Sequence, residues 1–238
     1  MFKIEELRVR VNGKDVLNDI NISIDKGEVL ILFGPNGSGK TSLLKTILGF
    51  SGYSIERGKI LFEGKVLNQL PTEERVKLGI GIMFQHPPKI RGVRLEQIAE
   101  FLARDGEEIE KLADKLSLKD HLNREINLDF SGGEMKRSEL FQVLLQKPKL
   151  LLLDEPESGV DIENISIMGE VLNQYLKETN ASALIITHTG YILDYVDANK
   201  AYVLIDGKIW CQGTPREIFE SIRKDGYEKC KECEWKKV

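Results

Sequence analysis

The chain has 238 residues, a length that suits one large domain or one domain with an inserted subdomain. Its hydrophobic fraction of 41% and charged fraction of 30% are typical of soluble globular proteins. The net charge of −4 disfavours a generally basic surface for nucleic acid. No apolar run is long enough to span a bilayer, and the N-terminus is acidic where a signal peptide would be basic and then apolar. We therefore expect a cytoplasmic protein that binds no nucleic acid and does not insert directly into a membrane.

Alternating, β-branched stretches predict two strands at the start of the chain, and Asn12-Gly13 between them is a strong hairpin signal. A continuous apolar run follows, which is typical of a strand buried on both faces. It ends in a glycine-rich turn, and the next helix is expected to stop at Gly49. The expected strands are Ile4–Val11, Val16–Ile24 and Glu28–Phe33, and the expected helix is Lys40–Leu48.

Apolar residues recur at helical spacing within residues 94–125, with charged residues on the other helix faces. Later in the chain strands alternate with helices, which predicts a mainly parallel sheet with helices on its faces. These later elements are strands at Leu150–Leu153, Ala183–Thr187, Ala201–Ile205 and Lys208–Cys211, and helices at Ile162–Glu178 and Pro215–Lys224. We predict an α/β core formed by residues 1–86 and 147–238, with a helical subdomain inserted at residues 87–146.

The segment from Gly34 to Thr41 fits the phosphate-loop pattern G-x-x-x-x-G-K-[ST], and it lies between a buried strand and a helix as this motif requires. Small residues let backbone N–H groups surround phosphate oxygens, and the helix start adds unpaired donors and partial positive charge. Lys40 can reach the β- and γ-phosphates of ATP, and the Thr41 hydroxyl can bind Mg²⁺. The residues expected around the nucleotide are Gly34, Pro35, Asn36, Gly37, Ser38, Gly39, Lys40, Thr41 and Ser42.

Two adjacent carboxylates follow the run of four leucines that ends at Leu153. Asp154 is expected at the carboxyl end of a parallel strand, beside the phosphate loop, where it can help to hold Mg²⁺. Glu155 should point in another direction, and it can polarise an attacking water. Alone, Asp-Glu-Pro would more often begin a surface loop. Beside a phosphate loop it favours a phosphate-loop NTPase of the RecA-like type.

Ser131-Gly132-Gly133-Glu134 is locally a capping box, in which the serine caps a helix and the glutamate reaches back. Two glycines weaken a first turn unless close backbone approach is useful. Together with Phe130, this segment resembles the Leu-Ser-Gly-Gly-Gln signature of the ABC ATPase family, with Phe for Leu and Glu for Gln. Three more motifs that resemble the family's occur in its order, and they are Phe84-Gln85-His86-Pro87, Ser158-Gly159-Val160-Asp161 and Ile185-Ile186-Thr187-His188.

The resemblance implies a Mg²⁺-dependent ATPase that converts ATP and water to ADP and phosphate. Two subunits would pack head to tail and trap two ATP molecules, which makes the ATP-bound state a homodimer. The implied catalytic residues are Lys40, Gln85, Glu155 and His188, the implied metal ligands are Thr41, Gln85 and Asp154, and the partner chain would supply Ser131, Gly132, Gly133, Glu134 and Asp161. Glu155 would activate water, His188 would contact the γ-phosphate, and Gln85 would sense the metal and the water. His86 and His121 have no comparable partners, and they are assigned no chemistry.

Many members of this family place an aromatic residue before the first hairpin turn, where it stacks on adenine. Val11 occupies that place here. We therefore expect weaker stacking and less selectivity for ATP over GTP, with Val16 as a possible source of apolar contact.

Several stretches resemble the SufC group of this family, the ATPases of SUF iron–sulfur cluster assembly. They are residues 84–93, 130–139, 157–162 and 192–196, while Arg91 departs from the proline that the group often has. This resemblance implies a SufB-like scaffold protein as partner, with contacts in Pro87–Arg94. The alternative is the nucleotide-binding subunit of a membrane ABC transporter.

Two other classes fit less well. A non-hydrolysing nucleotide-binding module is disfavoured because Lys40, Asp154, Glu155 and His188 are all present. A DNA-maintenance ATPase would be expected to carry a long coiled coil, whereas the insert here is short and shows no sustained heptads.

The chain has three cysteines, an odd and low count that fits a reducing compartment better than a disulfide framework. Cys230 and Cys233 have the spacing of metal ligands, but a four-coordinate site needs two more. A charged terminal extension with incidental thiols and a metal site completed by another chain both stay open.

Overall fold

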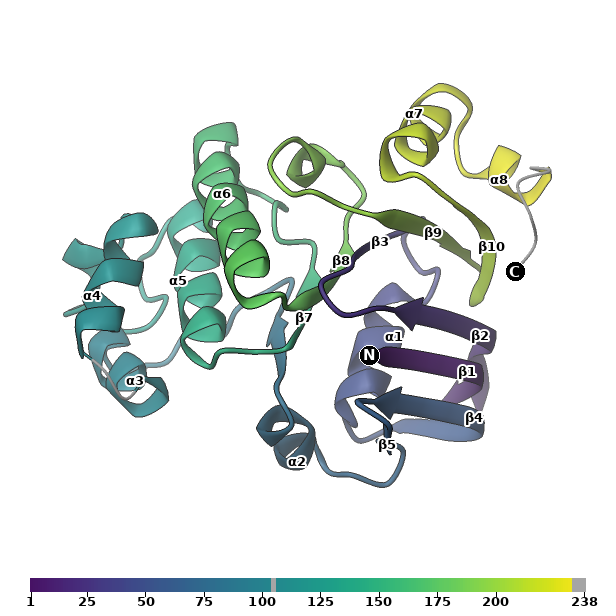
Figure 1. Ribbon diagram of the computed structural model, residues 1–238, viewed down its shortest axis with the longest axis horizontal. Helices are drawn as coiled ribbons and strands as arrows, with labels where there is room; N and C mark the ends of the chain where they lie inside the picture. The colour runs from purple at the N-terminus through teal and green to yellow at the C-terminus, as the bar shows by residue number, and fades with distance from the viewer. Residues whose placement is uncertain (104–105, 233–238) are drawn as a thin grey trace.

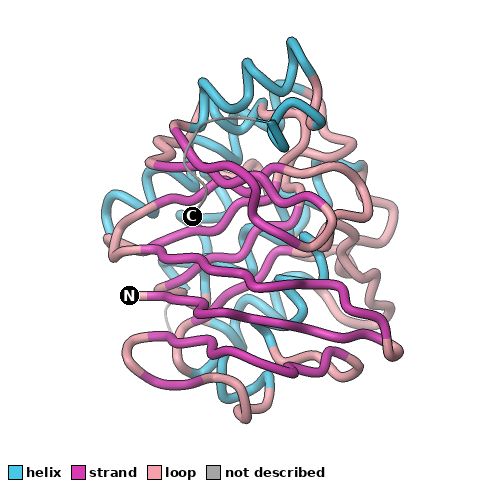
Figure 2. The backbone as a smooth tube through the Cα atoms, turned by 90° about the vertical axis from the view of Figure 1, so that its right-hand side faces the viewer, coloured by secondary structure: helices cyan, strands magenta, loops and turns pink. Residues whose placement is uncertain are grey.

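The computed structural model describes residues 1–103 and 106–232. Its strands form an antiparallel four-stranded sheet and a mixed, mainly parallel six-stranded sheet, as the sequence predicts. In Figure 1 the helices of the middle of the chain lie at one end of the molecule and the N-terminal sheet at the other. Figure 2 shows the strands of both sheets as stacked rows, with helices above and behind them. None of the helices in this described part of the chain has the length and apolar character of a membrane span.

The strands are β1 (Phe2–Val11), β2 (Lys14–Ile24), β3 (Val29–Phe33), β4 (Tyr53–Phe62), β5 (Lys65–Val66), β6 (Ile80–Met83), β7 (Leu150–Asp154), β8 (Ser182–Ile186), β9 (Lys200–Ile205) and β10 (Lys208–Gly213). The helices are α1 (Lys40–Leu48), α2 (Thr72–Lys77), α3 (Leu95–Leu102), α4 (Gly106–Lys115), α5 (Gly132–Leu145), α6 (Ile162–Thr179), α7 (Pro215–Asp225) and α8 (Glu228–Glu232). Short 3-10 turns lie at Lys119–His121 and Tyr191–Asp194.

The N-terminal sheet has the strand order β2-β1-β4-β5. The turn between β1 and β2 has φ of 50° at Asn12 and 76° at Gly13, and positive φ at both central residues is what a twisted two-residue hairpin requires. The predicted hairpin is therefore confirmed. The sequence analysis did not predict β4 and β5, because charged residues such as Glu56 and Arg57 lie on the exposed face of β4 and interrupt its apolar pattern.

The central sheet has the order β10-β9-β3-β8-β7-β6, and only β10 runs antiparallel to its neighbour. Side chains of β3 alternate between two cores: Ile31 and Phe33 join one apolar cluster, and Leu30 and Leu32 join the other. Because both faces are covered, an uninterrupted apolar run is compatible with a strand that alternates its side chains. The same reasoning applies to the four leucines of β7.

The register of the parallel strands aligns their carboxyl ends at one edge. Ile186 of β8 pairs with Leu32 of β3 on one side and with Asp154 of β7 on the other. Met83 of β6 pairs with Leu153 of β7. The segments that leave these four strands therefore begin side by side, although they are separated by up to about 150 residues of sequence.

The helices α3, α4 and α5 occupy the region between β6 and β7, where a helical insertion is predicted. Their apolar residues, such as Leu95, Ala113 and Phe141, belong to the same buried cluster as Ile31 of the central sheet. Helix α5 packs on β6 of the sheet, and α3 and α4 pack on α5. The domain limits at residues 87 and 146 stay a prediction.

The C-terminal end of α1 is held by Arg75, whose side chain is only 2% exposed. Its guanidinium donates to the carbonyl oxygens of Thr46 at 2.9 Å and Ile47 at 2.7 Å, and also to Leu70 at 2.7 Å. Carbonyls in the last turn of a helix have no partner within the helix, so a buried cation is well suited to this place. Gly49 ends the helix with φ of 76°, as predicted.

We expect Arg75→Met to lower the free energy of unfolding by about 2–4 kcal/mol, because several buried carbonyls would lose a charged donor. Arg57→Met is the control, since the Arg57 side chain is 67% exposed and its ion pair with Glu6 lies in solvent. Urea unfolding at pH 7 measures both. Equal stability of the two variants would contradict a structural role for Arg75.

Candidate functional site

The phosphate loop connects β3 to α1 at the aligned strand ends. A Cβ on Gly34 would lie 2.3 Å from the carbonyl oxygen of Leu204, so only glycine fits there. Gly39 precedes α1 with φ of 107°, a conformation that L side chains rarely adopt. Within the described residues no side chain caps α1, so its first N–H groups can donate to an anion. Ser38 Oγ is also buried without a hydrogen-bond partner in the described part of the chain, which fits a phosphate oxygen as its acceptor.

Lys40 and Thr41 are the first two residues of α1, and their side chains have different hydrogen-bond partners. Lys40 Nζ donates to the carbonyl oxygens of Gly34 at 2.7 Å and Pro35 at 2.9 Å, and burial lowers the pKa of this ammonium. Thr41 Oγ1 donates to Asp154 Oδ2 at 3.2 Å. Burial raises the pKa of Asp154, and the Thr41 hydrogen bond opposes that shift. A hydroxyl and a carboxylate side by side form a hard oxygen donor pair of the kind that Mg²⁺ prefers.

Glu155 lies at the centre of the aligned edge. Its Oε2 accepts a 2.6 Å hydrogen bond from Gln85 Nε2, and its Oε1 lies 3.3 Å from His188 Nδ1. Gln85 follows β6, His188 follows β8 and Glu155 follows β7, so the strand register brings these three residues to the same edge. The Glu155 backbone has φ of 49° and its N–H donates to Ile186 O at 3.0 Å, which turns its side chain away from that of Asp154.

A cavity of about 670 Å³ opens over the phosphate loop, a size that suits a nucleotide. Gln85 and Glu155 line one side of it. Val16, with Asp206 and Gly207, lines another side. Val11, which takes the place of the family's aromatic residue in the sequence, is not among the lining residues.

The backbone just before Gln85 is held by two side chains of α5. Lys136 Nζ donates to the carbonyl oxygen of Phe84 at 2.8 Å, and Glu139 Oε1 accepts from the Phe84 N–H at 2.7 Å. Both side chains are buried, and burial raises the pKa of Glu139 to about 7. The sequence analysis assigned no role to Lys136 or Glu139. Their spacing of three residues on one helix face was the available signal, since it places both charges against the same neighbour.

The predicted partner-chain residues lie outside this cavity. Ser131 caps α5 in a capping box: its N–H donates to Glu134 Oε2 at 2.7 Å, and its Oγ accepts from the Glu134 N–H at 3.3 Å. A Cβ on Gly132 would lie 2.8 Å from the carbonyl oxygen of Gly159, so close approach within the chain already requires this glycine. Asp161 caps α6 by accepting from the Asn164 N–H at 3.0 Å.

The structure therefore divides the predicted site residues into two groups. Lys40, Thr41, Gln85, Asp154, Glu155 and His188 converge at the strand ends. Ser131–Glu134 and Asp161 lie at the starts of α5 and α6 instead.

The sequence also matches a known protein family. The sequence model of the family described as "ABC transporter" matches residues 17–158, which is more than half of the chain. The chain belongs to the ABC ATPase family.

Relatives of this ABC ATPase match it over nearly its whole length. "Probable ATP-dependent transporter ycf16" of Trieres chinensis is 36% identical, with 96% of each chain covered. The protein of the same name from Cyanidium caldarium is 40% identical over 87% of each chain. A "Probable ABC transporter ATP-binding protein" of Streptococcus pyogenes serotype M1 is 32% identical, covering 95% of this chain and 93% of its own.

Solved structures share the fold. A nucleotide-free ATP-binding cassette from an ABC transporter has a TM-score of 0.80 at 24% identity, covering 94% of this chain and 95% of its own. A dimeric cassette described as a post-hydrolysis state bound to ADP and Pi has a TM-score of 0.76 at 24% identity, covering 91% and 99%. The structure of cbiO1 from Clostridium perfringens, described as part of the ABC transporter complex cbiONQ, has a TM-score of 0.77 at 28% identity, covering 94% of this chain and 93% of its own.

His121 of this ABC ATPase has partners that the sequence analysis did not foresee. Its Nε2 lies 3.1 Å from Glu134 Oε1, and its ring meets the edge of Phe130 with centroids 5.0 Å apart. These contacts lie outside the convergent site, and they give His121 no role in its chemistry. The 3-10 turn that ends at His121 lies beside the start of α5, so the imidazole packs next to the segment Ser131–Glu134.

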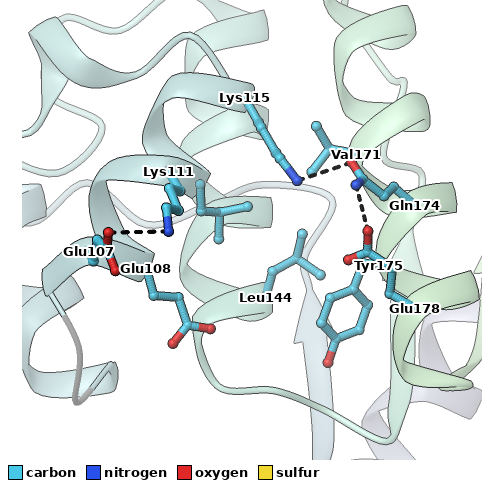
Figure 3. A pocket seen from close by; sticks show the side chains of 10 residues that line it. Glu107, Glu108, Lys111, Lys115, Leu144, Val171, Gln174, Tyr175 and Glu178 are labelled. Atoms are coloured by element: carbon cyan, nitrogen blue, oxygen red, sulfur yellow. Dashed lines mark hydrogen bonds and ion pairs between the residues drawn. The ribbon is translucent and has the colours of Figure 1, made fainter.

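A second hollow lies between α4 and α6, and Figure 3 shows its lining. Leu144 and Val171 form apolar parts of its wall, and Lys115 Nζ donates to Gln174 Oε1 across it at 3.1 Å. Its volume is about 280 Å³ and it contains none of the convergent site residues. The cavity over the phosphate loop, in contrast, is lined by Lys40, Thr41, Gln85 and Glu155.

The pKa of Glu139 gives a testable pH dependence. The folded protein holds the Glu139 proton up to about pH 7, whereas the ordinary pKa is 4.5, so folding is favoured most at low pH and stability is lost as pH rises through this window. We expect Glu139→Gln to flatten the stability curve between pH 4.5 and 7 by about 3 kcal/mol relative to the parent. Denaturant midpoints at closely spaced pH values measure it. Asp154 and Glu157 also have raised pKa values, but both residues are present in the parent and in the variant and affect the two stability curves equally. Parallel stability curves of parent and variant would contradict the prediction.

Proposed function

We propose that this ABC ATPase binds ATP with Mg²⁺ and hydrolyses it to ADP and phosphate. The observation that carries the proposal is the convergence of Gln85 and His188 on the two carboxylate oxygens of Glu155, beside the phosphate loop. A structural glycine-rich turn would not need a buried carboxylate with one polar partner on each oxygen. A site for water activation does need such a group, held in a fixed place.

The phosphate loop would hold the β- and γ-phosphates through its backbone N–H groups and Lys40. To do so, the Lys40 ammonium would exchange its hydrogen bonds with Gly34 and Pro35 for phosphate oxygens. Thr41, Asp154 and Gln85 are the proposed protein ligands of Mg²⁺, which when bound neutralises charge on the phosphate oxygens. No group of three or more His, Cys, Asp or Glu side chains suited to a metal occurs in residues 1–103 and 106–232. That fits Mg²⁺ held by few carboxylates and by the substrate's own phosphates.

Glu155 would accept the proton of the attacking water. One of its oxygens must first exchange its present partner for that water, and Gln85 is the partner that also belongs to the proposed metal site. His188 is half-exposed and would keep the carboxylate oriented while contacting the γ-phosphate. Lys40 and Asp154 provide charges of opposite sign close to Glu155, and burial strengthens their interactions.

The proposed active form is a head-to-tail homodimer. In one chain the cavity is bounded by the phosphate loop, Gln85 and Glu155, while Ser131–Glu134 and Asp161 lie elsewhere. Residues at helix starts, with N–H groups directed outward, are suited to receive the γ-phosphate bound by a second chain. Dimeric cassettes among the structural relatives support this arrangement.

We propose a SufC-like role, in which ATP-driven dimerisation acts on a SufB-like scaffold for iron–sulfur cluster assembly. Support comes from the stretches at residues 84–93, 130–139, 157–162 and 192–196. The nucleotide-binding subunit of a membrane ABC transporter is the second candidate, and the names of the Streptococcus pyogenes relatives favour it.

The helical region and the loop that leads to it carry exposed apolar side chains suited to a partner. Ile90, in the loop that follows Gln85, is 37% exposed, and Phe101 of α3 is 85% exposed. The loop is fixed to the helical region, because Asn127 Nδ2 donates to Pro88 O at 2.8 Å and the Ile90 N–H donates to Ile126 O at 3.1 Å. Only four residues separate Ile90 from Gln85 in the chain, so a partner bound to this loop could change the position of Gln85. The thiols of Cys230 and Cys233 are not part of this proposal, since Cys230 is buried and Cys233 lies outside the described residues.

We expect Glu155→Gln to abolish turnover but to keep ATP binding, because the amide cannot accept a proton while its shape is retained. The variant should accumulate as an ATP-bound dimer in size-exclusion chromatography with ATP and Mg²⁺, whereas the parent returns to monomer. Hydrolysis by the variant at the parental rate would refute the role of Glu155 as base.

We expect Phe101→Glu to lose the partner while it keeps basal ATPase activity, because the change places a charge on the docking surface far from the phosphate loop. Val66→Glu is the control, as Val66 is 47% exposed on β5, at the other end of the molecule in Figure 1. Affinity capture from the native cell in detergent measures both. A soluble cluster scaffold retained by Val66→Glu and lost by Phe101→Glu supports the SufC-like role, and a membrane-spanning subunit in its place supports the transporter.

A further inference from the structure

Glu157 is a buried carboxylate that the proposed mechanism does not use. It lies in the turn between β7 and α6, and its exposure is 4%. The turn is closed by backbone hydrogen bonds from the Ser158 N–H to Glu155 O at 3.1 Å and from the Val160 N–H to Glu157 O at 3.2 Å. The position of Glu157 is therefore tied to that of Glu155 by the backbone.

The side chain of Glu157 reaches the segment that carries His188. Its Oε1 accepts hydrogen bonds from the hydroxyls of Thr187 and Thr189, the second at 2.9 Å. These threonines are the two neighbours of His188 in the chain. Thr187 Oγ1 in turn accepts from the Gly190 N–H at 2.9 Å, which closes the turn behind the histidine. One carboxylate oxygen thus holds the backbone on both sides of His188.

This arrangement is energetically expensive for a purely structural contact. Burial raises the pKa of Glu157, and the two threonine hydroxyls only partly oppose this. Its other oxygen, Oε2, is buried with no hydrogen-bond partner in the described part of the chain. An uncharged side chain could fill the same space without the desolvation of a carboxylate. A buried charge in such a place is better explained by the geometry that it imposes.

We infer that Glu157 is a positioning residue for His188: by bonding Thr187 and Thr189 it sets the place at which the imidazole meets Glu155 and the γ-phosphate. The inference rests on the proposed ATPase function. Glu155 and Glu157 belong to one turn, so the carboxylate that activates water and the carboxylate that places the histidine move together. The 3.3 Å contact between His188 Nδ1 and Glu155 Oε1 is then maintained when the turn shifts.

The test uses the full chain with two variants, Glu157→Gln and Thr189→Val. Glutamine keeps the shape and weakens the acceptor, and valine removes one of the two donors with little change in volume. Glu163→Gln is the matched control, because Glu163 is an exposed acid in the first turn of α6. We expect kcat to fall about 10- to 100-fold for Glu157→Gln and less for Thr189→Val, with KM for ATP within twofold and with unchanged melting temperatures. Because both substitutions break the same contact, the fold-loss of kcat in the double variant should be smaller than the product of the two single fold-losses.

A second readout follows the histidine itself. The chain has three histidines, so its imidazole Hε1 region holds three resonances, and His188→Gln identifies one of them. We expect Glu157→Gln and Thr189→Val to move the His188 resonance and to leave those of His86 and His121 in place. An unmoved His188 resonance with parental kcat would overturn the inference, and so would a loss of ATP binding and thermal stability in Thr189→Val. If the parent itself hydrolyses no ATP, the proposed function fails, while the resonance still shows whether Glu157 positions His188.

Discussion

Backbone hydrogen bonds between β3, β8, β7 and β6 place the chemistry of this protein. Each of these strands is followed directly by a segment with a polar side chain, and the parallel register brings the four segments to one edge. Phe33 leads to the phosphate loop, Ile186 to His188, and Met83 to Gln85. The two apolar cores on either face of the sheet keep this register, because a slip by one residue would exchange the side chains of the two faces.

Buried ionisable side chains then hold the loops that follow these strands. Lys136 and Glu139 hold the backbone of Phe84, and Glu157 holds the threonines beside His188. Both loops end on Glu155, one at each carboxylate oxygen. Removing so many charged groups from water costs free energy, and the matching hydrogen bonds recover only part of it. In return, hydrogen bonds to ionised side chains define the positions of the loops more narrowly than apolar contacts do.

In the proposed homodimer, the site within one chain is incomplete. The starts of α5 and α6 are shaped by close packing within the chain, with Gly132 against Gly159 and Asp161 capping α6. These contacts keep Ser131–Glu134 rigid and away from the chain's own cavity. In the proposed homodimer this surface would meet the nucleotide of the second chain, so catalysis would depend on association of the two chains.

The sequence by itself determined the phosphate loop, the strand-end carboxylates and the mainly parallel sheet, because these depend on local patterns: glycines at a strand-to-helix turn, and apolar runs that end in Asp154. The sequence did not predict β4, β5, β6 and α2, where exposed charges or Gly81 interrupt the apolar pattern. It also gave Lys136, Glu139 and Glu157 no role. Only the tertiary structure decided these, since each acts on a backbone or hydroxyl group at least 30 residues away in the chain. Periodicity within a segment carries no information about which distant segment will need a charged partner.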